Sequence, residues 1–173
     1  MSGDRDAFGV LATQSLPRLV GTAGLILGRL DLAEDAAQES LVRAWRDLPS
    51  LRDPDRFEAW LYRVLVRACH DEARRARRLP VVELAVEPAG TLRDPAAAIA
   101  ERDAIGAGLR RLSREQRTVL VLRFYLDLSY EDMAVALSVP VGTVKSRVSR
   151  ALPALRATLE ALERTDARQG RPT

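Results

Sequence analysis

Residues 129–152, SYEDMAVALSVPVGTVKSRVSRAL, hold the pattern of two short helices joined by a tight turn. Ser129, followed three positions later by an acidic residue, is typical of a helix start, and this helix is predicted to end near Leu137. Residues 138 and 139 form the turn. Pro140 suits the first turn of the next helix, because its missing N–H is not needed there. This is a helix-turn-helix pattern, although a generic helical hairpin has the same appearance.

The second helix of this pair has an apolar face that includes Val144 and Val148, and a polar face on the opposite side. Small hydroxyl side chains and an arginine on the polar face can reach base edges in a DNA major groove, while cations on its flanks can contact phosphates. Pro153 predicts that the helix kinks or ends near Leu152. The candidate DNA-binding residues of this helix are Thr143, Lys145, Ser146, Arg147, Ser149 and Arg150.

Helical periodicity continues through the rest of the chain, and no convincing strand alternation occurs. Asp31 is the expected N-cap of a helix over residues 32–48, with Glu34 as its partner, and several glycines predict a weaker helix before it. The fold class is therefore all-α, with two small helical domains joined by a flexible linker that is rich in proline. The predicted segments are a first domain (1–79), the linker (80–97), a helix-turn-helix domain (98–164) and a disordered tail (165–173).

The helix predicted over residues 57–78 carries a stripe of cations beside its apolar face. Four arginines and His70 follow one another at intervals of four and three residues, with no acidic residue among them. Guanidinium groups suit phosphate because each offers a planar fork of donors. The stripe therefore indicates contact with nucleic acid, and a plain solvated surface is the alternative. Its arginines are Arg63, Arg67, Arg74 and Arg77.

Charge is unevenly distributed along the chain, although the net charge is only +3. Residues 57–78 hold six arginines against three acidic residues, and residues 109–156 hold nine basic residues against four acidic ones. The intervening residues 80–105 hold two arginines against five acidic residues. Two basic blocks separated by an acidic stretch favour a nucleic-acid partner, while ordinary solvated helix faces would give a similar pattern.

Several classes of protein are excluded by what the sequence lacks. Cys69 and His70 are the single cysteine and the single histidine, so no disulfide, Cys/His zinc cluster or nucleophile with its base is expected. We therefore expect no enzyme, no metal and no cofactor. The apolar run over residues 20–27 is too short to cross a bilayer, and the N-terminus is unlike a signal peptide. A cytoplasmic protein without membrane insertion is expected.

Two sets of motifs resemble the extracytoplasmic-function (ECF) class of bacterial sigma factors. In the first domain these are AEDAAQE (33–39), LVRAW (41–45) and FEAWLYRV (57–64). In the second they are LSREQR (112–117), YLDLSYE (125–131) and VGTVKSR (141–147). The resemblance implies a promoter-specificity subunit that binds core RNA polymerase and promoter DNA and stabilises the melted promoter. It also implies an anti-sigma factor as a partner.

The resemblance assigns a role to each candidate site. The face formed by Asp35, Gln38 and Glu39 would contact the β′ clamp helices of the polymerase, whose β flap is a further expected contact. The arginine stripe would grip DNA backbone near the −10 element, and the second helix-turn-helix helix would read the −35 element. The loop expected to hold a flipped base of the −10 element comprises Ser50, Leu51, Arg52 and Asp53.

The sequence departs from the family at Arg67, where many members carry Asn. A stand-alone helix-turn-helix regulator is the alternative function, since it would also bind DNA. Such a regulator needs no acidic and amide face on its first domain, and it would need a dimer interface or a sensor domain. The motifs of the first domain therefore favour the sigma factor.

Overall fold

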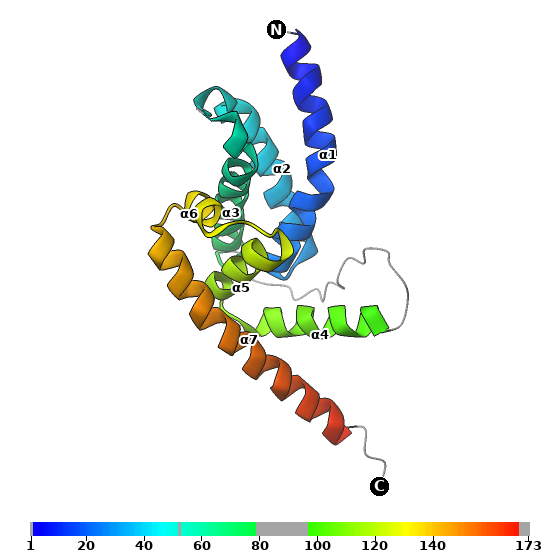
Figure 1. Cartoon of the computed structure of the whole chain (residues 1–173). Coiled ribbons are helices and arrows are strands. Elements are labelled where there is room, and N and C mark those ends of the chain that lie inside the picture. The colour runs from blue at the N-terminus through cyan, green and yellow to red at the C-terminus, as the bar shows by residue number, and fades with distance from the viewer. Residues whose placement is uncertain (1, 52, 79–96, 170–173) are drawn as a thin grey trace.

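The computed structural model describes residues 2–51, 53–78 and 97–169, and these residues form helices and turns with no strand (Figure 1). The predicted all-α fold with two helical parts is confirmed. We call α1–α3 the N-terminal unit and α4–α7 the C-terminal unit. The helices are α1 (Ser2–Leu27), α2 (Leu30–Asp47), α3 (Phe57–Ala76), α4 (Ala97–Arg111), α5 (Arg114–Leu120), α6 (Tyr130–Leu137) and α7 (Val141–Gln169).

The N-terminal unit is a bundle in which α1 and α3 pack on α2. The inner face of α2 consists of alanines and one serine, so its neighbours approach closely. Gly24 of α1 faces this surface, and a Cβ built on it would lie 3.9 Å from the Cβ of Ala33. Gly24 therefore lies at the contact between α1 and α2, and packing against α2 supports this part of α1.

The C-terminal unit contains the predicted helix-turn-helix. Ser129 caps α6, its side chain accepting from the backbone N–H of Asp132 at 3.0 Å. Ser138 ends α6 in the left-handed conformation with φ of 56°, and the Val139 N–H donates to the Ala134 carbonyl at 3.1 Å. This hydrogen-bond pattern is that of a Schellman turn, which directs α7 away from α6. The helix before it is α5, and a π-helical turn, η3 (Val121–Tyr125), follows α5.

The two units share one continuous apolar core. Helix α6 packs on α3, while α5 and η3 pack on α1. Gly21 of α1 makes room for Tyr125, since a Cβ there would lie 2.9 Å from the tyrosine Oη. Gly28, which follows α1 with φ of +71°, lies under Arg117 of α5. The N-terminus of α1 and the C-terminal end of α7 point to opposite ends of the molecule (Figure 1).

Three local predictions are wrong. Asp31 does not cap α2, because the helix begins at Leu30, two residues earlier than expected, and Asp31 pairs with Arg29 at its start. Pro153 does not end α7, which continues to Gln169. Pro153 has no N–H to donate to the carbonyl of Ser149, four residues earlier. Both residues are exposed, so water can bond to that carbonyl instead. Residues 165–169, predicted as tail, are therefore helical.

One segment, Asp6–Leu27 of α1, is long and apolar enough to cross a membrane by length and composition alone. Its inner face is part of the protein core, where Leu19, Ala23 and Ile26 are buried. The buried share of the apolar window in this segment is 22%. The predicted linker lies almost entirely outside the described residues.

Candidate functional site

The outer face of α2 presents two of its three candidate residues to solvent. Asp35 and Gln38 are exposed, whereas Glu39 is half-buried. Arg43 donates from Nε to Glu39 Oε1 and from Nη1 to Asp71 Oδ2, both at 2.8 Å. These bonds connect α2 to α3 and fix the Glu39 carboxylate at the edge of the exposed face. The hydrogen bond from Arg43 is also the main reason why the pKa of Asp71 is lowered.

The loop between α2 and α3 is built from two short 3-10 turns, η1 (Leu48–Ser50) and η2 (Pro54–Arg56). Ser50 donates its hydroxyl to the Asp47 carbonyl at 2.6 Å, and Asp53 accepts from the Asp55 N–H at 3.1 Å. Leu51 between them is half-buried. Arg52, the remaining candidate of this loop, lies outside the described residues. The local bonds hold the loop ends in shape and leave Ser50 and Asp53 exposed.

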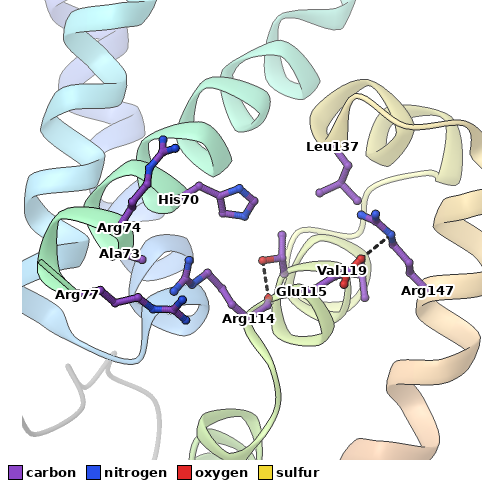
Figure 2. Close-up of a pocket in the computed structure, with 10 residues that line it drawn as sticks. His70, Ala73, Arg74, Arg77, Arg114, Glu115, Val119, Leu137 and Arg147 are labelled. Carbon is purple, nitrogen blue, oxygen red and sulfur yellow. Dashed lines mark hydrogen bonds and ion pairs between the residues drawn. The ribbon is translucent and has the colours of Figure 1, made fainter.

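The cationic stripe of α3 lies on its exposed side, as its spacing predicted. Arg67, Arg74 and Arg77 are exposed and Arg63 is half-buried. Arg74 donates to Asp71, so part of its charge is compensated. The C-terminal end of the stripe, from His70 onward, turns toward the C-terminal unit (Figure 2). Burial there, together with the nearby Arg114, lowers the pKa of His70, which favours the neutral imidazole at neutral pH.

The polar face of α7 is open to solvent. Val144 and Val148 on its apolar face are buried, and its candidate residues are exposed except Thr143 and Arg147, which are half-buried. The exposed candidates are Lys145, Ser146, Ser149 and Arg150.

Several of these side chains bond locally within the C-terminal unit. Ser146 Oγ donates to the Thr143 carbonyl at 2.9 Å, and Arg150 Nε donates to the Ser146 carbonyl at 3.1 Å. Arg147 instead pairs with Glu115 of α5 at 2.7 Å, which braces α7 against α5. A ligand on the polar face of α7 must therefore compete with local hydrogen bonds, which are weak individually.

Comparisons with known proteins give the same division of the chain. Residues 11–79 match the family model of sigma-70 region 2, and residues 102–155 match that of sigma-70 region 4. The RNA polymerase sigma-H factor of Pseudomonas aeruginosa is 34% identical, over 94% of this chain and 91% of its own length. The chain belongs to the ECF class of sigma factors. The ECF sigma factor SigW of Bacillus subtilis is 30% identical, over 92% of each chain.

A solved structure has the same fold as this ECF sigma factor. The sigma factor RpoE of Bartonella quintana, crystallised with the anti-sigma factor NepR, superposes with a TM-score of 0.71 at 29% identity. The match covers 89% of this chain and 97% of the RpoE chain. The likeness therefore includes both helical units.

Sequence reasoning did not find the residues that connect the sites to one another. Arg43 stands on α2 between the exposed face and α3, Glu115 pairs with Arg147 of α7, and Arg114 lines the same cleft as the end of α3. Arg43 lies four residues after Glu39, a spacing that predicts the first of its two ion pairs. The contacts of Arg114 and Glu115 span different helices, and no spacing in the sequence marks them.

Proposed function

We propose that this sigma factor engages core RNA polymerase through the exposed face of α2 and reads two promoter elements with its two helical units. The observation that carries the proposal is the exposed Asp35 and Gln38 pair within the region 2 match. Carboxylate and amide groups exposed on one helix face suit a basic, polar partner such as the β′ clamp helices. The β flap is the proposed contact of the C-terminal unit. In this function the chain is not an enzyme.

The proposed DNA contacts divide between the two units. In the N-terminal unit, residues 50–53 would capture a flipped base of the −10 element, and the α3 stripe would hold the adjacent backbone. In the C-terminal unit, the exposed face of α7 would enter the major groove of the −35 element, with Ser146, Ser149 and Arg150 nearest to the bases. Each contact set is weak alone, and attachment to one polymerase would raise their effective concentration. The working boundaries are 1–79, 80–97 and 98–164.

Run-off transcription tests the proposal. Purified chain and bacterial core RNA polymerase would be incubated with a library of genomic fragments, and new transcripts would be sequenced. We expect specific transcripts with the wild type and a loss of at least about tenfold with the D35A/Q38A double variant. The matched control is D6A/Q14A, which removes the same two chemical groups from exposed positions of α1.

The same experiment distinguishes the sigma factor from a stand-alone regulator. If the core enzyme neither binds the chain nor initiates, while the free chain shifts duplex DNA of defined sequence, a stand-alone regulator is the better account. The transcripts themselves would give the promoter motifs.

We also propose an anti-sigma factor as a partner and the cytoplasm as the place of action. The supporting observation is the structural match to RpoE, which was crystallised with the anti-sigma factor NepR. Purification of the tagged chain from its own cells should yield a stoichiometric protein that is displaced by core RNA polymerase. Recovery of the chain without a bound protein, under conditions in which its promoters are silent, would contradict this proposal.

A further inference from the structure

A cleft of about 580 Å³ lies where α3 meets the C-terminal unit (Figure 2). One wall comes from the end of the α3 stripe, and the other comes from α5 and the start of α7. The charged and titratable residues of the lining are His70, Arg74, Arg77, Arg114, Glu115 and Arg147. Four arginines thus face a space in which Glu115 is the single acidic lining residue.

Among the described residues, two of these four arginines have an acidic partner and two have none. Glu115 pairs with Arg147 at 2.7 Å, and Arg74 pairs with Asp71 outside the cleft. Among residues 2–51, 53–78 and 97–169, no carboxylate lies within ion-pair distance of Arg77 or Arg114. The pKa of Arg114 is lowered, mainly by burial and then by the charge of Arg77. The surroundings of Arg114 therefore disfavour the charged form of its guanidinium.

Arg77 and Arg114 come from different units, and their side chains extend toward the same region of the cleft (Figure 2). The positive charges of Arg77 and Arg114 repel each other, and this repulsion opposes the contact between the units. The apolar packing of α6 on α3 maintains that contact. An anion between them would remove the repulsion and accept hydrogen bonds from two guanidinium forks. Linked phosphates carry more negative charge than a single phosphate or sulfate, and they can present a separate group of oxygens to each fork.

The size of the cleft selects among phosphate compounds. Its volume lies within the range of about 300–1,000 Å³ that is typical of small-molecule sites. A DNA duplex, whose major groove alone is about 12 Å wide, is too large for it. An anion of nucleotide size or smaller fits the space between the two walls.

We propose that this cleft binds a small anion with two or more linked phosphates, which bridges Arg77 of α3 and Arg114 of α5 and holds the two units together. The site overlaps the candidate promoter contacts at Arg77 and does not depend on polymerase binding. Since Arg77 is also a candidate contact for promoter backbone, bound anion and DNA compete for it. The anion therefore favours the closed, DNA-free arrangement of the two units.

Isothermal titration calorimetry of the full chain tests the site, with inorganic pyrophosphate, tripolyphosphate and ATP as probes. Orthophosphate and sulfate at matched ionic strength are the comparison anions, and binding of either one as tightly as pyrophosphate would overturn the requirement for linked phosphates. We expect saturable binding of the probes and a loss of about tenfold in affinity in R77Q and in R114Q. The control R156Q removes an exposed arginine of α7 outside the cleft and should change the affinity less than twofold.

Equal affinity for tripolyphosphate and ATP would assign recognition to the phosphates, and tighter binding of ATP would assign it to a nucleotide; both support the site. Absence of saturable binding, or equal binding by wild type, R77Q and R114Q, would overturn it. Hydrogen exchange of the wild-type chain serves as a second readout that needs no variant. Pyrophosphate should protect both the end of α3 and α5, and protection of one alone would refute the bridge between the units.

Discussion

Replacement of Arg43 by glutamine tests how the exposed face of α2 is held against α3. In the structure Arg43 donates to Glu39 and Asp71, each at 2.8 Å, from a side chain that is 20% exposed. Glutamine retains the polar character and part of the length, but it cannot donate to two carboxylates with a positive charge. The variant should therefore lose both charge-assisted bonds without creating a large cavity.

The expected destabilisation follows from the exposure of the three groups. A hydrogen bond to a charged group contributes about 1.5–3 kcal/mol when protected from solvent, but exposed ion pairs contribute under about 1 kcal/mol. The carboxylates of Asp71 and Glu39 are 29% and 36% exposed, so solvent screens both pairs in part. We expect a loss of about 1–2 kcal/mol in the free energy of unfolding. For a chain of this length, this lowers Tm by roughly 2–8 °C.

The destabilisation should depend on pH. The pKa of Asp71 is lowered in the folded state, first through the hydrogen bond from Arg43. A carboxyl with a lowered folded pKa contributes stability above its unfolded pKa of about 4, and this contribution disappears as pH falls through the folded value. Wild type and R43Q should therefore differ fully at pH 7 and progressively less below about pH 4.

Chemical denaturation monitored by circular dichroism at pH 7 and at pH 3 measures this difference. R46Q is the matched control, because Arg46 lies on the same helix and its pair with the adjacent Asp47, at 3.7 Å, is exposed. We expect R46Q to lie within about 0.5 kcal/mol of the wild type. A difference for R43Q that is the same at pH 3 and pH 7, or no larger than that of R46Q, would refute the reasoning. Loss of polymerase affinity in R43Q would show that Glu39 must be held in place.

Three further predictions concern local features. Ser138→Gly should stabilise the chain by about 1 kcal/mol, because a non-glycine residue in the left-handed conformation is strained. Calorimetry should therefore show a higher Tm, and a lower Tm would show that the serine side chain compensates for this strain. Cys69 is buried with its pKa raised to about 12, so a thiol reagent at pH 8 should label the native chain on the order of 100-fold more slowly than the unfolded chain. Rapid native labelling would contradict its burial. Ser113→Ala removes the bond from the Gln116 N–H to the Ser113 hydroxyl, while the backbone N–H of residue 113 can still donate to the Gln116 side chain. The loss should cost about 1 kcal/mol in urea titrations, and a change of under about 0.3 kcal/mol would mean that the cap is dispensable.

The helices and their exposed faces were largely predictable from local patterns. The burial of Val144 and Val148 and the exposure of Ser146, Ser149 and Arg150 follow from a period of 3.6 residues, which is visible in one segment of sequence. The same holds for the α3 stripe. The end of α7 was not predictable in this way, because a proline on an exposed face loses one backbone bond that water can replace.

Contacts between segments far apart in the chain depend on how the units pack. Spacing placed Arg77 and Arg114 on their respective helices, but it could not show that α3 and α5 form two walls of one cleft. Nor could it show that Arg147, predicted on a DNA-facing flank, pairs with Glu115, or that Gly21 makes room for Tyr125. Periodicity reports which face of a helix avoids water, and it predicted the helices and their exposed faces. The sigma-factor function was expected from the resemblance of the motifs to the ECF class. Which helix faces meet depends on shape and charge complementarity across the whole chain. The ion pair of Arg43 with Asp71, which connects α2 to α3, and the cleft between the units were therefore visible only in the tertiary structure.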